Sequence, residues 1–236
     1  MGTNGVAKGS TARTICNYTL ADSVKIVVQA WCPVSSVNKI AFLGITPTEV
    51  GVYTVSATGG TPTRIYSVNQ TTSLLNPGPL ECGSLTWSND GTKLAFVEQS
   101  PLSTPDTERI YMIRVINTSG VLQTTLDSGN HCLGGLKWSH SGMDSIACYR
   151  TNVLHNSVSS DFDLYVIGVT AGSTPRFVKS SAICAFWSPN NSELLYSNYT
   201  NASPGIAKIN VRSGATTSLS SISYGSVGNY GDWKQP

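Results

Sequence analysis

The chain has 236 residues, of which 12% are charged, and its formal net charge at pH 7 is +2. It has no cluster of lysine and arginine interleaved with aromatic residues, which argues against nucleic-acid binding, and no apolar run approaches the roughly 18 residues of a membrane-spanning helix. The length suits one all-β domain with a substantial core.

Two β-like segments precede the first tryptophan. Residues 11–20 are rich in threonine and other β-forming residues, and residues 24–30 predict an inner strand that leads directly into Trp31. The first residues of the chain, Met-Gly-Thr-Asn-Gly-Val-Ala-Lys, lack the apolar core of a signal peptide.

One phrase opened by tryptophan then recurs along the chain. Its clearest copy reads Trp87-Ser-Asn-Asp-Gly-Thr-Lys-Leu-Ala-Phe96. The tryptophans that open the successive copies are Trp31, Trp87, Trp138, Trp187 and Trp233. They are 56, 51, 49 and 46 residues apart, and a near-constant period of this size predicts a repeat architecture. We expect the first four to occupy equivalent places and to pack between adjacent sheets.

Each copy continues with two further strand signals. About twenty residues after the tryptophan comes an alternating apolar run, at 52–57, 110–115, 164–169 and 206–211. A glycine-containing turn and a short, more polar strand follow, the strand at 63–66, 121–126, 175–178 and 215–219. Such short connections predict antiparallel hairpins, because a parallel return needs a long crossover.

With the strand that ends at tryptophan and the one around Leu94, each unit therefore predicts four antiparallel strands. The turn between the first two, Asn89-Asp90-Gly91 in the clearest copy, contains residues that tolerate positive φ. We expect Asp90 to be a turn residue and not a catalytic acid. Four-stranded sheets repeated about every fifty residues predict an all-β fold, a β-propeller. A β-sandwich is the alternative, but it gives no reason for one phrase to recur in successive hairpins.

The phrase of the second unit, followed by Ile110-Tyr-Met-Ile113 and a glycine, resembles the repeat of the TolB-like propellers, also called WD40-like repeats. It is similar in the same way to the propellers of the dipeptidyl-peptidase and prolyl-oligopeptidase group. The resemblance covers about residues 25–236, although the first unit lacks the Asp-Gly turn and the third has Ser141-Gly142 in its place. It implies a disc with a central channel and with binding surfaces on either face.

The whole chain, residues 1–236, is expected to form a single propeller domain. The repeats are predicted at about 25–80, 81–131, 132–181 and 182–225, with a partial fifth unit at 226–236. We expect about five blades, with the amino-terminal segment 11–20 completing the last one, since an open sheet edge favours aggregation. Two alternatives remain: the chain is part of a six- to eight-bladed protein, or a neighbouring molecule supplies the missing strand.

The six cysteines are widely spread, at Cys16, Cys32, Cys82, Cys132, Cys148 and Cys184. They lack the local spacing of a zinc site, so they are either small buried side chains or members of disulfides. The easiest local pairs are Cys16–Cys32 and Cys132–Cys148. Six Asn-x-Ser/Thr sequons also favour an extracytoplasmic protein, periplasmic or secreted, and they lie at Asn17, Asn69, Asn117, Asn190, Asn198 and Asn201.

Candidates for catalysis are few. Of the three histidines, His131 stands at the start of an inner strand and can face the channel, while His140 and His155 lie in a turn and a loop and are expected to be solvated. Asp161 and Asp163, the one close carboxylate pair, are expected to be solvated edge charges. The sequence contains neither a Gly-x-Ser-x-Gly nucleophile elbow nor a histidine-based metal motif. We therefore predict no catalytic, cofactor-binding or metal-binding residue.

The sequence thus predicts a non-enzymatic binding or scaffold module that recognises a protein partner. Long, varied loops at 98–109 and 151–163 support this prediction, because recognition usually lies on loops carried by a rigid scaffold. A carbohydrate-binding or carbohydrate-active propeller with its site at the channel mouth is one alternative, since residues contributed by separate blades leave no linear motif. Self-assembly by strand exchange at the incomplete last blade is the other.

Overall fold

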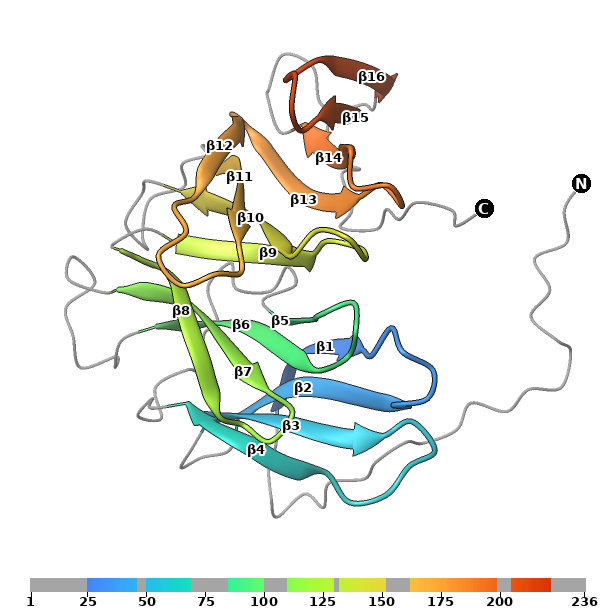
Figure 1. The fold of residues 1–236 in the computed structure, drawn as a ribbon, viewed down its shortest axis with the longest axis vertical. Helices are drawn as coiled ribbons and strands as arrows, with labels where there is room; N and C mark the ends of the chain where they lie inside the picture. The colour runs from blue at the N-terminus through green and yellow to red at the C-terminus, as the bar shows by residue number, and fades with distance from the viewer. Residues whose placement is uncertain are drawn as a thin grey trace, which may run out of the picture.

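The computed structural model describes residues 25–45, 50–68, 85–99, 110–129, 132–151, 162–198 and 205–221. Across these ranges the chain contains only strands, turns and irregular connections, and the strands form four antiparallel sheets of four strands each (Figure 1). None of the described segments is a helix long and apolar enough to cross a bilayer. The predicted all-β class is confirmed.

Each sheet consists of four consecutive strands joined as antiparallel hairpins. The strands of the first sheet are β1 (Lys25–Trp31), β2 (Lys39–Ile45), β3 (Val50–Ser56) and β4 (Thr63–Val68). Those of the second are β5 (Leu85–Trp87), β6 (Lys93–Gln99), β7 (Tyr111–Asn117) and β8 (Leu122–Gly129). Those of the third are β9 (Cys132–Trp138), β10 (Ser145–Thr151), β11 (Phe162–Gly168) and β12 (Arg176–Lys179). Those of the fourth are β13 (Ala182–Trp187), β14 (Glu193–Asn198), β15 (Gly205–Asn210) and β16 (Thr216–Ser221).

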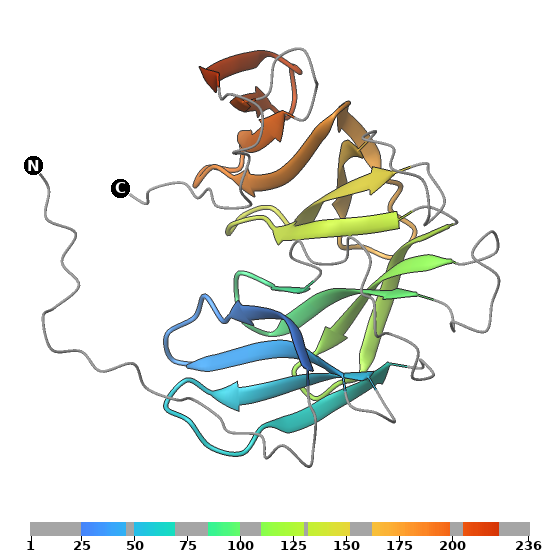
Figure 2. The same ribbon diagram turned by 180° about the vertical axis from the view of Figure 1, so that it is seen from behind.

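The four sheets follow one another in an arc, with their first strands toward its inner side (Figures 1 and 2). Along this inner side β1 contacts β5, β5 contacts β9, and β9 contacts β13. An apolar core fills each gap between neighbouring sheets; Val52 of the first sheet, for example, shares a core with Leu85 and Phe96 of the second. Radial stacking of four-stranded sheets is the arrangement of propeller blades, and the sheets are called blades one to four below.

The turns have the backbone conformation that the sequence predicts. The first hairpin of each blade contains one residue of positive φ, namely Asn38, Gly91, Gly142 and Asn191. In the hairpins between the third and fourth strands of the blades the residues of positive φ are glycines, namely Gly59, Gly60, Gly120, Gly172 and Gly214. Gly91 is also required for space, because a Cβ there would lie 2.9 Å from the Cys32 sulfur of the preceding blade.

The first strand of each blade ends at a tryptophan. Paired in register with Trp31, Trp87, Trp138 and Trp187 are Ile40, Leu94, Ile146 and Leu194 of the second strands. The predicted equivalence of the four is confirmed. The last three are buried in the core that their blade shares with the preceding one. Trp31 is 59% exposed, so the expectation that it packs between sheets is wrong here, because no described blade precedes the first.

Two of the buried indoles make the same hydrogen bond to the preceding blade. Nε1–H of Trp87 donates to the carbonyl oxygen of Ala30 at 3.0 Å, and Nε1–H of Trp187 donates to that of Lys137 at 3.0 Å. In both cases the acceptor is the residue just before the tryptophan of the earlier blade. The repeated phrase therefore encodes a contact between blades as well as a strand end.

Blades two and three are joined by other polar contacts. The indole of Trp138 donates to Oδ1 of Asp144 in its own blade at 2.8 Å, while its backbone N–H donates to Oγ1 of Thr86 at 3.3 Å. The Arg150 guanidinium donates from Nε and Nη2 to Oδ2 of the buried Asp127, at 2.9 and 2.6 Å. Because this ion pair is mostly removed from water, loss of either partner would leave a poorly solvated charge.

Two of the described cysteines, Cys32 and Cys148, are free thiols. Cys148 is free and belongs to the core between blades two and three. The predicted Cys132–Cys148 pair is wrong, because Cys132 lies opposite Thr151 in the β9–β10 register. Three residues of strand, about 10 Å, then separate the two cysteines, which is beyond the reach of a disulfide. Cys32 is also a buried free thiol, and its predicted partner Cys16 lies outside the described residues.

Several sequence predictions concern residues outside the described ranges. They are the closing segment 11–20, the partial fifth unit with Trp233, most of the loops at 98–109 and 151–163, and His131, His155 and Asp161. The described blades number four, and closure of a five-bladed ring stays a prediction.

Candidate functional site

The ends of the four inner strands meet around a hollow of about 340 Å³. Its walls come from β1, β5, β9 and β13 and from the turns that follow them. The side chains around it include Gln29, Trp31, Asn89, Lys137, His140 and Phe186. This hollow, called the channel mouth below, is where a carbohydrate site was predicted.

Aromatic side chains give the channel mouth an apolar surface. Trp31 is exposed and Phe186 is half-buried. The ammonium of Lys137 lies 4.7 Å from the centroid of the Phe186 ring, within the range of a cation–π contact. The mouth thus combines flat rings from the first and fourth blades with one cation from the third.

His140 is half-buried at the channel mouth, which corrects the expectation that it is solvated. Its backbone N–H donates to Oδ1 of Asn191 at 2.8 Å, and its Nε2 lies 3.3 Å from the carbonyl oxygen of Trp187. A carbonyl oxygen only accepts, so Nε2–H is the donor in this contact. Both partners belong to the next blade, and His140 therefore joins blades three and four.

Two of the candidate carboxylates, Asp90 and Asp163, hold turns and connections between strands. Asp90 Oδ1 accepts hydrogen bonds from the Ser88 hydroxyl at 2.6 Å and from the Thr92 backbone N–H at 3.0 Å, which confirms it as a turn residue. Asp163, half-buried on β11, accepts a hydrogen bond from the backbone N–H of Ser181 at 3.3 Å, which corrects the expectation that it is a solvated edge charge. Within the described ranges no three His, Cys, Asp or Glu side chains lie close enough to hold a metal ion.

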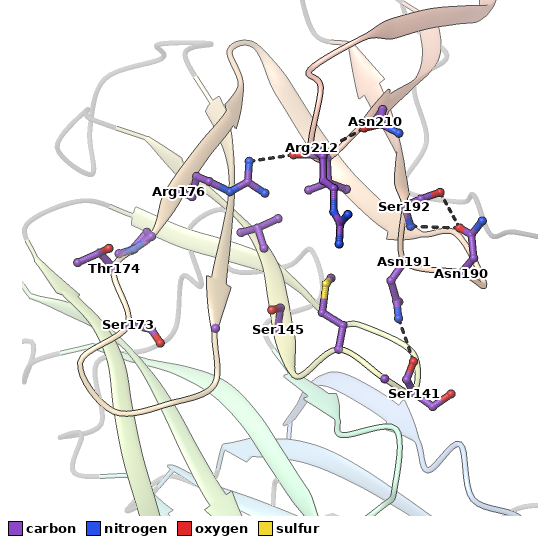
Figure 3. Close-up of a pocket in the computed structure, with 16 residues that line it drawn as sticks. Ser141, Ser145, Ser173, Thr174, Arg176, Asn190, Asn191, Ser192, Asn210 and Arg212 are labelled. Atoms are coloured by element: carbon purple, nitrogen blue, oxygen red, sulfur yellow. Dashed lines mark hydrogen bonds between the residues drawn. The ribbon is translucent and has the colours of Figure 1, made fainter.

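A larger hollow lies between blades three and four (Figure 3). It has a volume of about 1100 Å³, is open to solvent, and is walled by the turns that follow β9, β11, β13 and β15. Met143, Val166 and Val211 give it an apolar floor, because all three belong to the core that the two blades share. Serine, threonine and asparagine side chains form most of its rim. We call this hollow the interblade groove.

Two arginines border the interblade groove from different blades (Figure 3). Arg176 begins β12 and Arg212 lies in the turn after β15, and both are exposed. Nη1 of Arg176 donates to the carbonyl oxygen of Val211 at 2.9 Å, which holds this guanidinium beside the turn that carries Arg212. None of the described residues that line the groove is acidic, so the groove is a site of positive potential.

The neutral amides of the groove hold its walls. Nδ2 of Asn191 donates to the carbonyl oxygens of His140 at 3.2 Å and Ser141 at 3.1 Å, which ties the first turn of blade four to that of blade three. Oδ1 of Asn210 accepts a hydrogen bond from the backbone N–H of Arg212 at 3.1 Å and fixes the turn between β15 and β16. These bonds make the groove a preformed feature of the fold.

Sequence reasoning missed the residues that line the interblade groove. Arg176 and Arg212 belong to different repeats, and periodicity marks the residues that build blades, not those that differ between blades. One signal was available: Arg212 stands two positions before the turn glycine Gly214, and Arg176 follows the turn at Gly172. Turns at corresponding places in successive blades emerge on the same face of a propeller.

Comparison with known proteins identifies the fold. No protein-family model matches the chain, and no curated protein matches its sequence. TolB from Acinetobacter baumannii aligns over 84% of this chain and 44% of its own, with a TM-score of 0.59 and 14% identity. An oligogalacturonate lyase in complex with manganese aligns over 77% and 50%, with a TM-score of 0.55 and 17% identity. A chain of a nidogen–laminin complex aligns over 80% and 62%, with a TM-score of 0.54 and 12% identity.

These similarities confirm the predicted β-propeller of the TolB-like kind. At such identities they show the fold alone. The chain spans about half the length of the matched TolB and lyase chains. Because a lyase shares the fold with TolB, enzymatic or binding activity has to be argued from the site and not from the fold.

Proposed function

We propose that the chain is a non-enzymatic binding module, a TolB-like propeller that mediates protein–protein interaction through the face that carries the interblade groove. The observation behind the proposal is the groove itself, an open hollow of about 1100 Å³ whose turns are fixed by hydrogen bonds that the Asn191 side chain donates and the Asn210 side chain accepts. Preformed walls reduce the ordering entropy that binding costs. One structure of similar fold is a complex between two proteins, nidogen and laminin.

The expected setting of the module is outside the cytoplasm, in the periplasm or secreted. The sequons support this setting; of the described ones, Asn117 is the half-buried last residue of β7 and Asn190 is exposed in the turn after β13. The buried free thiols Cys32 and Cys148 need no particular redox environment, because neither is accessible in the folded chain.

Site-specific photo-crosslinking tests the proposal. The photoreactive residue p-benzoylphenylalanine replaces Ser141 at the groove in one variant and Leu219 on the outer strand β16 in a control; both positions are exposed. After irradiation in an extract of the source cells or their medium, we expect discrete protein adducts from position 141 and none from position 219. Equal adducts from both positions, or none from either, would contradict the proposal.

A carbohydrate-binding site at the channel mouth is the second candidate. The exposed Trp31 and the half-buried Phe186 offer flat apolar surfaces, while Gln29, Asn89 and Lys137 offer polar groups beside them. A site of this composition suits a ligand with apolar ring faces and hydroxyl edges. An oligogalacturonate lyase is among the proteins of similar fold.

A glycan array, with a screen for hydrolase and lyase turnover, decides between the two candidates. A carbohydrate site predicts binding that Trp31→Ala abolishes and that the Leu219 control leaves unchanged. Turnover of any substrate in the screen would replace the binding module by an enzyme. If the module is a protein binder, neither assay gives a saturable signal.

A further inference from the structure

We infer that the interblade groove binds an acidic peptide segment of the partner, with the carboxylates on Arg176 and Arg212 and an aliphatic side chain on the floor. The inference rests on the proposed function and names the chemistry of its partner. Three features of the groove support it: its positive charge, the available N–H donors of its two arginines, and its apolar floor.

The charge of the groove is uncompensated. Arg176 and Arg212 come from neighbouring blades to the same hollow, and none of the described lining residues is acidic. The carboxylates nearest to the lining in sequence are already paired: Glu193 with Lys208, at 3.0 Å between Oε1 and Nζ, and Asp144 with Lys93, at 3.6 Å between Oδ2 and Nζ. Two guanidinium groups without a counter-ion form a complementary surface for two carboxylates.

The arginines also keep most of their hydrogen-bond donors available. A guanidinium has five N–H donors, and the one described hydrogen bond of Arg176 uses Nη1, toward Val211. Arg212 is positioned through its backbone, by Asn210, which leaves its side chain to reach toward the hollow (Figure 3). Arginine binds carboxylates with two parallel hydrogen bonds, so each arginine can take one carboxylate in a defined orientation.

The asparagine side chains in the first turn of blade four are already used within the protein. Both described donor bonds of the Asn191 amide go to carbonyls of the facing turn, and Asn190 Oδ1 accepts hydrogen bonds from the hydroxyl and backbone N–H of Ser192, at 2.7 and 3.1 Å. These two side chains shape the groove, and we assign recognition to the arginines and to the floor of Met143, Val166 and Val211. Such a floor accepts an aliphatic side chain.

The size of the groove favours a peptide over a small anion. Its volume of about 1100 Å³ lies above the range of about 300–1,000 Å³ that encloses small molecules. It opens to solvent between two rows of turns, which suits a chain that enters and leaves. No aromatic residue is among its described lining, so the groove offers no platform on which nucleic-acid bases would stack.

Fluorescence polarisation with a defined peptide array tests the inference. The probes are labelled, end-blocked eight-residue peptides in which two Glu or Asp and one Leu, Ile or Val occupy every mutual spacing. Each has an isostere with Gln and Asn in place of the acids. The proteins are the full chain, the double variant Arg176→Gln/Arg212→Gln, and Arg64→Gln, an exposed arginine of blade one that serves as the matched charge control.

We expect acidic peptides to bind the full chain at least tenfold more tightly than their isosteres. The double variant should lose at least tenfold in affinity and Arg64→Gln less than twofold. Affinity should also fall as the salt concentration rises from 50 to 500 mM, because exposed charges are then screened. The affinity of the single variant Arg212→Gln for acidic peptides should fall about threefold or more. Because this variant keeps the Arg176–Val211 hydrogen bond, it controls for any disturbance of the fold by the double variant.

Three results would overturn the inference. The first is an array in which no acidic peptide binds better than its isostere, and the second is a double variant with unchanged affinity. The third is displacement of the peptide by 10 mM inorganic phosphate at constant ionic strength, which would make the groove a site for small anions. The photo-crosslinking test at position 141 separates this failure from failure of the proposed function. If position 141 forms protein adducts but no acidic peptide binds, the face still binds a protein, and its specificity is for something other than acidic peptides.

Discussion

Asp90 and Asn190 occupy the same place in the first turns of blades two and four. Each accepts a hydrogen bond from the serine two positions before it, at 2.6 Å from Ser88 and 2.8 Å from Ser188. Each also accepts a backbone N–H from two positions after it, at 3.0 and 3.1 Å. The turn therefore needs an oxygen acceptor at this position, and a carboxylate or an amide supplies it equally well.

This equivalence predicts different outcomes for two substitutions of Asp90. Asp90→Asn should cost little, because Asn190 shows that an amide fits, whereas Asp90→Ala should lower the free energy of unfolding by about 0.5–1.5 kcal/mol, the net value of a lost hydrogen bond. Urea titration at pH 7 measures both. Equal losses from the two variants would show that the acceptor oxygen is not what the turn requires.

The contribution of Asp90 should depend on pH. The hydrogen bond from the Ser88 hydroxyl, with further bonds from Thr92 and the nearby charge of Lys93, holds the pKa of Asp90 below its ordinary value in spite of partial burial. A lowered pKa in the folded state stabilises the fold above the unfolded pKa of about 3.9, and this stabilisation is lost as the pH falls through the folded value. The stability difference between the wild type and Asp90→Asn should therefore be constant from pH 7 to 5 and change only below about pH 4.

The surroundings of Cys148 raise the pKa of its side chain, whereas those of Asp90 lower the pKa of that carboxyl. Burial, with the nearby carboxylate of Asp127, raises the pKa of the Cys148 thiol to about 12. Because the thiolate is the reactive form, we expect Cys148 to resist thiol reagents at pH 8 until the chain unfolds. Reaction of a wild-type and a Cys148→Ala protein with Ellman's reagent, with and without urea, checks this. The two native proteins should release the same number of thiolates, and a faster native reaction of the wild type would contradict the buried position.

At the scale of the strand, the four tryptophans occupy equivalent places, but their replacement by alanine should lower the free energy of unfolding by different amounts. Trp138 is buried between two blades, so Trp138→Ala should lower the free energy of unfolding by about 3–5 kcal/mol, as for other large buried aromatics. Trp31 is mostly exposed among the described residues, so Trp31→Ala should lower the free energy of unfolding by less than about 1 kcal/mol if no further blade covers it, and by as much as Trp138→Ala if a fifth blade does. Denaturant titration of both variants measures the contrast. A large loss for Trp31→Ala would show that a further blade covers it.

The same strands show what can be predicted from sequence. Register and turn chemistry repeat with the sequence, so the strand ends at tryptophan and the positive φ at Gly91 and Gly142 follow from local residue types. The exposure of Trp31 depends on which blade lies beside it, and this cannot be predicted from the residues around Trp31. The bridge from His140 to the Trp187 carbonyl and the meeting of the two groove arginines arise only when successive blades stack.

At the scale of the whole molecule, the first blade has apolar side chains on both faces. Leu43 faces the core shared with blade two, while on the other face Phe42 and Tyr53 stack with their ring centroids 5.4 Å apart. Alternate residues of a strand point to opposite faces, so a strand with two apolar faces belongs between two neighbours. The exposed Trp31 beside this second face marks the place of one of them.

We propose that the partial fifth unit, residues 226–236, fills this place and that residues 11–20 complete its sheet. Deletion of residues 1–20 should then leave an unpaired strand edge, which favours aggregation or domain-swapped oligomers. Size-exclusion chromatography with light scattering measures the assembly state, and deletion of residues 1–10 is the matched control, which should behave as the full chain. If the 1–20 deletion stays monomeric with unchanged thermal stability, residues 11–20 are not the closing strand. A full chain that is itself oligomeric, and that dissociates when a synthetic strand of residues 11–20 is added, would instead indicate closure by a neighbouring molecule.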